Sequence, residues 1–202
     1  MQIELLVLPD PERNDPLNEP AAAGLRALAA ELGTEHANVA DWLSAARGEA
    51  AHVRAVVPGG GRPHLVIAVR AESAQRGPGA PSTLSRVQAA GLALGALASE
   101  VADGSPTRIW WGREDCAVDE VLWRGVRVGE QRPGAPERVA PEPEFAAGEP
   151  VPDSWRRSAD AVRWVRELVE LPPNRLGPGS SRSAFRSTAG RMPPSRWRSG
   201  MP

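Results

Sequence analysis

The feature that most constrains the fold is an unbroken apolar run, Leu65 to Val69, within the segment HLVIAVR. A strand with one wet face alternates apolar and polar residues, whereas a strand covered on both faces can be apolar throughout. The run therefore predicts an interior strand with a packed layer on each side. Helices elsewhere in the chain must supply those layers, which indicates an α/β fold with a mixed sheet.

The segment before this run predicts a hairpin partner. Residues 51–57 alternate between small apolar side chains and other types, as in a half-buried strand, and we expect them to pair with residues 64–70. The glycines 59–61 between them could suggest a phosphate-binding loop. Such loops join a strand to a helix N-terminus, and this one joins two predicted strands, so we interpret it as a hairpin turn.

The clearest predicted helix is Ser82 to Val101, where apolar and small residues recur three and four positions apart. Its other faces are rich in Ala, Leu and Gly, so we expect it to be largely buried. Gly91 and Gly95 have the spacing of close helix–helix contacts, but we interpret them as allowing the helix to approach the sheet. The other predicted elements are strands at Ile3–Leu8 and Thr107–Trp111 and helices at Ala21–Leu32, Val39–Arg47 and Val118–Val128.

Changes in composition divide the chain. We expect an α/β body at residues 1–132 and a proline-rich linker at 133–152. Within residues 153–178, Asp153 can cap a helix that runs to Leu171. Residues 179–202 are rich in Arg, Ser and Pro without apolar periodicity, so they are predicted to be disordered. The predicted apolar face of the helix comprises Trp155, Ala159, Val162, Val165 and Val169.

Composition also bears on the binding partners and the cellular location of the protein. The formal net charge of -1 does not favour a nucleic-acid or anionic-membrane partner. We interpret the arginine-rich tail, with Phe185 and Trp197, as solvated rather than as a nonspecific nucleic-acid binder. A single cysteine fits a reducing compartment, the first residues do not resemble a signal peptide, and no apolar run approaches the ~20 residues of a membrane span. We therefore expect a cytoplasmic protein.

The segment RELVELPPNRLGPG, residues 166–179, resembles the connection between the two domains of leucyl aminopeptidases, also called cytosol aminopeptidases. That family usually has arginine, an acid, leucine and valine, then asparagine-threonine-proline-proline-asparagine and leucine-threonine-proline. Glu170, Leu171 and Gly177 depart from this pattern. The matching residues are Arg166, Glu167, Leu168, Val169, Pro172, Pro173, Asn174, Leu176 and Pro178.

The resemblance implies that residues 1–132 are the family's non-catalytic front domain, with a macro-domain-like fold. That domain would help to assemble the oligomer or shield the active-site entrance. The implied partners are further copies of the chain or an aminopeptidase catalytic domain.

The family's hydrolase activity, release of N-terminal amino acids from peptides, belongs to the domain that follows. It uses two divalent metals, such as manganese or zinc, held by carboxylates and a lysine. This sequence has no lysine and no acidic residue after Glu170. We therefore expect an inactive part of such a peptidase, without catalytic, cofactor-binding or metal-binding residues. Our hypothesis is that truncation or a shifted reading frame precedes the catalytic domain.

Histidines and the cysteine are interpreted as structural. His36, His52 and His64 lack the spacing of metal ligands, so we expect surface or strand-edge positions. Cys116 follows Asp115, and neighbouring carboxylates disfavour a reactive thiolate.

Trp110 and Trp111 are adjacent on a predicted strand and must face opposite sides of it, so we expect core packing rather than ligand stacking. The alternative to a chain without a metal site is a chance site formed by Glu114, Asp115 and Asp119. Asp119 and Glu120 diverge by about 100° on a helix and form no clamp.

Two other functions stay open. A macro-like fold could bind a nucleotide or ADP-ribose, although the chain lacks a glycine-rich strand-to-helix turn that would carry this function. An active metalloaminopeptidase is disfavoured by the missing lysines and acids.

Overall fold

The structure, a computed structural model of the 202-residue chain, describes residues 2–9, 15–35, 38, 39, 41, 43, 52–59, 62–70, 82–101, 105–113, 115–130, 142–148 and 150–170. The chain divides into two compact units, residues 1–162 and 163–202. In the described part of the chain, no helix combines the length and the hydrophobicity needed to cross a membrane. The tail predicted to be disordered, residues 179–202, lies outside the described residues, as does His36.

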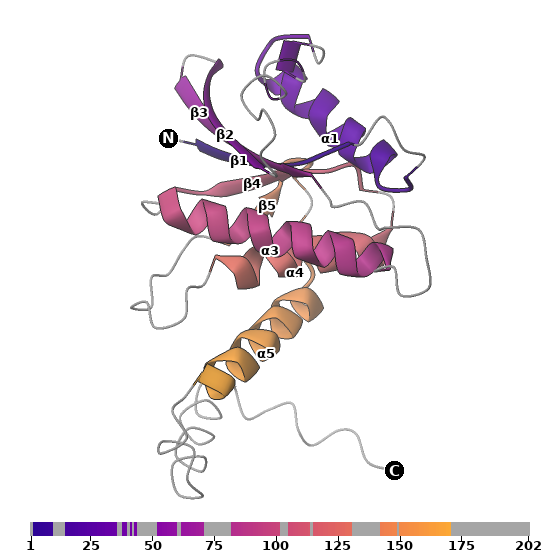
Figure 1. Cartoon of the computed structure of the whole chain (residues 1–202), viewed down its shortest axis with the longest axis vertical. Coiled ribbons are helices and arrows are strands. Elements are labelled where there is room, and N and C mark those ends of the chain that lie inside the picture. Colours follow the sequence, from indigo (N-terminus) through magenta and orange to yellow (C-terminus); the bar gives the residue numbers. More distant parts are fainter. Residues whose placement is uncertain are drawn as a thin grey trace, which may run out of the picture. The chain divides into compact units, whose positions relative to one another are not determined.

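The first unit contains a five-stranded mixed sheet in the order β2-β3-β1-β4-β5 (Figure 1). In its centre, β1 (Gln2–Leu8) pairs in parallel with β3 (Arg62–Arg70) and with β4 (Thr107–Trp110). At the edges, β2 (His52–Gly59) is antiparallel to β3, and β5 (Glu144–Phe145) is parallel to β4. The predicted α/β fold with a mixed sheet is confirmed.

The apolar run that constrains the fold lies where the sequence predicts. β3 is an interior strand, and every residue from Leu65 to Val69 is buried. The predicted hairpin is also confirmed, because β2 and β3 are consecutive and antiparallel. β2 ends at Gly59 and β3 begins at Arg62, so a strand and not a helix follows the glycines, of which Gly60 and Gly61 lie outside the described residues.

Helices cover both faces of the sheet (Figure 1). α1 (Asn18–Glu31) packs on one face, and α3 (Thr83–Val101) and α4 (Cys116–Gly129) lie on the other. The end of α1 is marked by Gly33, whose φ of 69° is a conformation that favours glycine. The start of α4 is capped by Asp115, whose Oδ1 accepts a hydrogen bond of 2.8 Å from the backbone N–H of Ala117.

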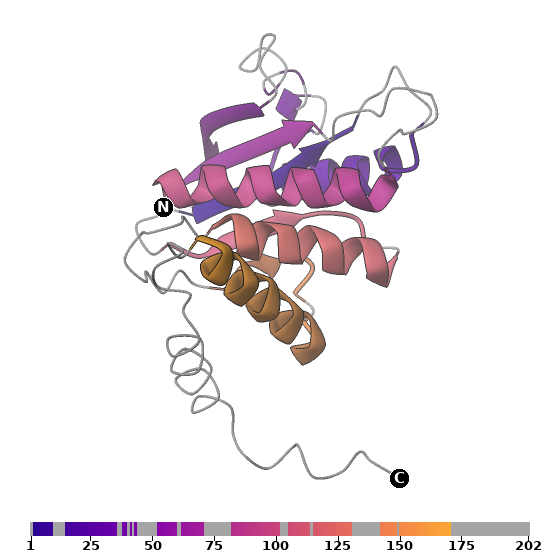
Figure 2. The ribbon, with the colours of Figure 1, turned by 60° about the horizontal axis from the view of Figure 1, so that its bottom comes forward.

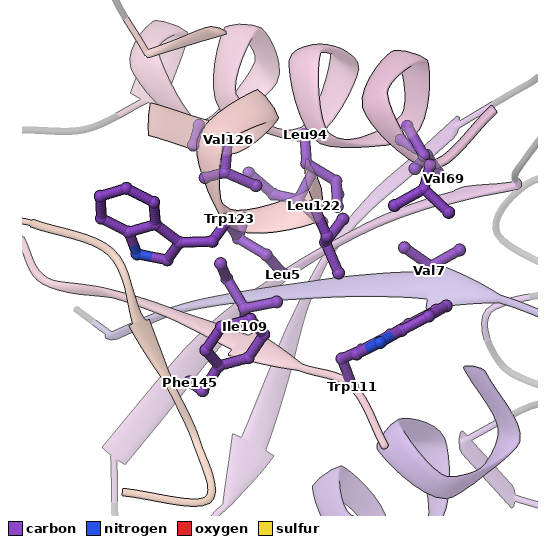
Figure 3. Packing of buried hydrophobic residues seen from close by; sticks show 14 of the residues in the cluster. Leu5, Val7, Val69, Leu94, Ile109, Trp111, Leu122, Trp123, Val126 and Phe145 are labelled. Atoms are coloured by element: carbon purple, nitrogen blue, oxygen red, sulfur yellow. The ribbon is translucent and has the colours of Figure 1, made fainter. Parts of the chain in front are cut away.

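The larger core lies between the sheet and the α3–α4 layer. Figure 3 shows Leu5 and Ile109 of the sheet facing Leu94 of α3 and Leu122 and Val126 of α4, and all five are at most 1% exposed. A second core on the α1 face includes Leu6, Leu28, Val66 and Trp110. Of the predicted helix at 39–47, Val39, Asp41 and Leu43 are described as helical, and the valine and leucine join this second core.

α3 and α4 lie side by side (Figures 1 and 2), and glycines on both helices form their contact. A Cβ atom on Gly95 would lie 2.1 Å from the carbonyl oxygen of Val126, and one on Gly91 would lie 2.6 Å from that of Leu122. Gly125 and Gly129 of α4 face the backbone of α3 in return. Our interpretation that Gly91 and Gly95 approach the sheet is therefore wrong, because they pack against a helix.

The expectation that this helix is largely buried also needs correction. Val87, Leu94 and Ala98 are buried, but Ala89, Ala93 and several neighbours on the outer face are exposed. Alanine and glycine favour close packing, yet they do not require it, so their presence gave too little information about burial.

The stretch expected to be a linker contributes to the sheet and the core. β5 lies inside residues 133–152, and Phe145 and Val151 are 3% and 7% exposed. α5 (Asp153–Glu170) follows, with Trp155 and Ala159 buried against this core. The prolines indicated an irregular path, and a strand of two residues is too short to produce a periodic signal.

The predicted helix over Asp153–Leu171 is present as α5, with two differences. Asp153 is its first helical residue rather than its cap, and its carboxylate accepts a hydrogen bond from Arg156. The predicted apolar face is buried at Trp155 and Ala159, but Val165 and Val169 are exposed by 51% and 77%.

Candidate functional site

A cluster of polar side chains surrounds Glu4, which is 0% exposed. Glu4 Oε1 lies 2.7 Å from His64 Nδ1 and accepts a hydrogen bond of 2.6 Å from Arg108 Nη2. Its Oε2 accepts hydrogen bonds from Arg108 Nε at 3.1 Å and from Trp110 Nε1 at 2.7 Å. Arg108 continues the cluster to Glu31 at the end of α1, where Nη1 donates to Oε1 at 3.1 Å. We call these five residues the Glu4 network.

Strand register brings the Glu4 network together. Glu4 lies opposite Arg108 in β4, and Leu6, two residues later on the same face, lies opposite Trp110. On the other side, Gln2 lies opposite His64 of β3. The side chains of Glu4 and Trp110 thus face the α1 layer, where α1 ends at Glu31.

The hydrogen bonds of the Glu4 network stabilise the fold. Burial of a lone carboxylate is costly, and here charge-assisted hydrogen bonds from several donors offset that cost. The Glu4 hydrogen bonds with Arg108 raise the pKa of the Arg108 guanidinium above its usual value, while partial burial lowers it. Both oxygens of Glu4 are already engaged, so the carboxylate is occupied by the protein's own donors rather than by a substrate.

The histidines fall in different places. His64 is 4% exposed on an interior strand, so the expectation of a surface or strand-edge position is wrong for it. His52 is exposed on the edge strand β2, as expected. The error for His64 arises because its buried acceptor, Glu4, is 60 residues away in the sequence.

A second polar cluster follows β4. The chain leaves β1 toward α1 on one face of the sheet and leaves the adjacent β4 toward α4 on the other face. This is a topological switch point, the place where open α/β sheets usually bind ligands. Trp111 and Arg113 lie in the loop after β4, and both donate to Asp119 of α4, at 3.1 Å and 3.3 Å.

The charged groups at this switch point are paired with one another. Asp15, before α1, accepts a hydrogen bond from Arg86 of α3, and both side chains are less than 10% exposed, at 7% and 9%. Arg113 also stacks over Phe145, with 5.0 Å from its Cζ to the ring centroid. Burial raises the pKa of Asp119, while Arg113 and Trp111 oppose that shift. The arrangement stabilises the loop after β4.

Two of the three acids considered as a chance metal site lie in the described residues, and their environments differ. Asp115 is an exposed helix cap, Asp119 is buried beside Trp111, and Glu114 lies outside the described residues. In the part of the chain that the structure describes, no three His, Cys, Asp or Glu side chains are grouped closely enough to hold a metal ion. Cys116 is exposed at the start of α4.

Trp110 and Trp111 pack as predicted. They occupy the cores on opposite faces of the sheet, and each is 6% exposed. The indole N–H of each donates to a buried acid, Glu4 for one and Asp119 for the other.

Glu130, directly after α4, is a buried acid outside both clusters. Its Oε1 accepts a hydrogen bond of 3.1 Å from the Thr107 hydroxyl. Its Oε2 is buried without a hydrogen-bond partner, and Arg127 Nη1 lies 3.7 Å away. Burial raises the pKa of Glu130 to about 7, and attraction to Arg127 only partly opposes the shift.

The sequence reasoning missed Glu4, Arg108 and Glu130. A signal existed for the first, because Glu4 is the single charge in the apolar segment IELLVL. A charge there predicts a buried partner, although it does not identify which residue provides it.

No protein-family model and no curated protein matches this chain.

Proposed function

We propose that this chain is the non-catalytic front domain of a leucyl aminopeptidase-type metallopeptidase, with a macro-domain-like fold. The observation that carries the proposal is the segment at residues 166–179, RELVELPPNRLGPG, which resembles the connection between the two domains of that family. A mixed α/β body before this segment is consistent with it. A cytoplasmic location belongs to the same proposal and is supported by the lone cysteine, Cys116.

α5 supports the assignment of residues 166–170 to a connecting segment. It is one continuous helix, whose first half packs on the body through Trp155 and Ala159 and whose last turn begins the resembling phrase. Val165 and Val169 precede the Pro-Pro-Asn motif and are exposed, as expected for residues that contact a following domain.

The polar clusters also favour a supporting role over catalysis. Glu4 and Asp119 each accept hydrogen bonds from buried or partly buried donors of the same chain. Groups arranged in this way stabilise a fold, whereas a catalytic group must direct a donor or acceptor at its substrate.

The purified 202-residue chain is expected to release no leucine from a leucyl amide when manganese, zinc or cobalt is supplied. A binuclear metal site needs several converging oxygen ligands and a polarising cation, and this sequence has no lysine and no acid after Glu170. A leucyl aminopeptidase holoenzyme in the same assay is the positive control. Metal-dependent activity that follows the chain through repurification and is lost in Asp115→Ala would contradict the expectation.

The supporting role can be tested by mixing the chain with a separately expressed leucyl aminopeptidase catalytic domain. We expect a complex in size-exclusion chromatography with light scattering, weakened by Val165→Lys together with Val169→Lys. Ala161→Lys, at another exposed position of α5, is the matched control and should leave the complex intact. If the wild-type chain forms no complex, the proposed role fails.

A nucleotide- or ADP-ribose-binding module is the alternative function. The switch point after β1 and β4 is where such a ligand would bind, but the pairs Arg86–Asp15 and Arg113–Asp119 lie there. Titration calorimetry with ADP-ribose separates the two functions. Saturable binding that is weakened by Arg113→Ala would favour the alternative.

A further inference from the structure

β2 forms the longer of the two edges of the sheet. It has 8 residues, against 2 in β5 at the opposite edge, and within the described residues no strand pairs with its outer side. An unpaired edge presents N–H and C=O groups that a further strand can join. Val56, within this edge strand, is 59% exposed.

Two opposed prolines determine which backbone groups of β2 face outward. Pro58 lies directly opposite Pro63 of β3, and neither has an N–H, so this pair cannot exchange hydrogen bonds. Hydrogen-bonded and non-hydrogen-bonded pairs alternate along an antiparallel ladder. The odd-numbered residues of β2 therefore bond to β3. The even-numbered residues 52–58 direct their backbone groups away from the sheet.

The side chains of β2 also alternate between the two faces. Arg54 lies on the α3 side, where its guanidinium pairs with Glu100, and Val56 lies on the same side. On the α1 side, the odd-numbered positions from Val53 to Val57 are apolar and buried or half-buried. One side of the strand is thus apolar, and the charge on the other side is balanced within the chain.

We propose that the outer edge of β2 pairs with β2 of a second copy of this chain, antiparallel, about a twofold axis at Ala55. In this register Arg54 of each copy lies opposite Val56 of the other. We call the line along which the two β2 strands meet the seam. In both of these pairs the backbone groups point across the seam and exchange main-chain hydrogen bonds. On the α1 side, Val53 of each copy lies opposite Val57 of the other, so that face of the seam is apolar.

The neighbouring registers are less favourable. Centring the axis on Arg54 places two arginines directly opposite one another, which is destabilising. Centring it on Val56 sets Arg54 against Pro58, which has no N–H to donate. The Ala55 register avoids the paired arginines. It places Pro58 opposite His52 at the two ends of the ladder, so both central Arg54–Val56 pairs keep their hydrogen bonds, whereas the Val56 register leaves only the Val56–Val56 pair intact. This pairing is independent of the function proposed above, because it involves neither α5 nor residues 166–179.

A cysteine substitution at position 55 tests both the pairing and its register. In the full chain with Cys116→Ser, Ala55→Cys places two thiols in a non-hydrogen-bonded pair across the seam. The Cα atoms of such a pair are about 4.5 Å apart, within the range of a disulfide. We expect a disulfide-linked dimer under mild oxidation. Val57→Cys in the same background is the matched control and should cross-link little, because position 57 lies opposite position 53. Failure of the Ala55→Cys variant to cross-link, or equal cross-linking at both positions, would overturn the proposal.

Proline at position 56 tests the main-chain hydrogen bonds. Val56→Pro removes an outward N–H and leaves the hydrogen bonds to β3 intact, which is where an edge strand tolerates proline. By light scattering over a concentration series, we expect its association constant to fall about tenfold or more. Val56→Thr keeps the N–H and should retain most of the dimer. The proposed pairing would be contradicted if the wild-type chain stays monomeric at every concentration. It would also be contradicted if a folded Val56→Pro variant dimerises as strongly as the wild type. If Val56→Pro does not fold, the cross-linking of the Ala55→Cys variant decides.

Discussion

Replacing Glu4 by alanine should lower the free energy of unfolding by about 3–5 kcal/mol, the range typical for removal of one partner of a buried ion pair. The substitution removes the common acceptor of His64, Arg108 and Trp110. His64 and Trp110 are almost completely buried, so water cannot replace the lost acceptor without opening the structure. Urea unfolding monitored by tryptophan fluorescence measures the loss.

Two further variants locate the source of that loss. Glu31→Ala removes only the exposed end of the Glu4 network, where the Glu31 side chain is 45% exposed, and should cost at most about 0.5 kcal/mol. Combining Glu4→Ala with Arg108→Met should cost less than the sum of the single changes, because no unpaired guanidinium is left behind. Strict additivity, or a Glu4→Ala loss below about 1 kcal/mol, would show that these groups are not coupled.

Raising the pH through neutrality should destabilise the chain through Glu130 by about 3 kcal/mol. The pKa of this carboxyl rises from an ordinary 4.5 to about 7 on folding, so the folded state holds the proton more tightly than the unfolded state. Its stabilising contribution is complete below pH 4.5 and is lost as the pH rises through about 7. The difference between the two pKa values sets the magnitude.

Urea midpoints between pH 5 and pH 8.5 measure this dependence, and Glu130→Gln should remove most of it. At pH 8 the variant should be more stable than the wild type, because a neutral amide is buried there in place of a charge. Glu120→Gln removes a charge from the neighbouring α4, where Glu120 pairs with Arg124 at 3.6 Å, and should retain the wild-type pH dependence. If Glu130→Gln and Glu120→Gln behave alike, Glu130 is not the titrating group.

The function proposed here and the second copy proposed at β2 concern different parts of the chain. The first depends on residues 166–179 and the exposed valines of α5, whereas the second depends on the outward backbone groups of β2. Lysine substitutions at Val165 and Val169 should therefore leave the β2 pairing unchanged. Val56→Pro should likewise leave the interaction with a catalytic domain unchanged.

Local pattern was enough to predict most of the elements of the α/β body. The apolar run Leu65–Val69 predicted an interior strand, because only a strand packed on both faces excludes polar residues along its whole length. The hairpin of β2 and β3 and the opposite placement of Trp110 and Trp111 followed from the two-residue period of a strand. These features depend on residues that are close together in the sequence.

Features that depend on distant neighbours could not be read in the same way. Helical periodicity showed that Gly91 and Gly95 share a face, but not that α4 rather than the sheet lies against it. β5 has only two residues, too few for a period, and it is a strand because β4 lies beside it. The amphipathic pattern of α5 was present throughout, although Val165 and Val169 of its predicted apolar face are exposed.

The sequence by itself determined the α/β class, the interior strand and the hairpin, because each follows from the period of side chains along a single segment. Only the tertiary structure decided how the polar groups are used. Glu4 meets His64 and Trp110 across 60 and 106 residues of chain, and the buried Glu130 side chain accepts a hydrogen bond from Thr107, 23 residues earlier. The burial, the hydrogen-bond partners and the pKa of a side chain depend on the residues that surround it in the folded protein. The sequence pattern does not predict them, because it does not show how far apart two segments lie in space.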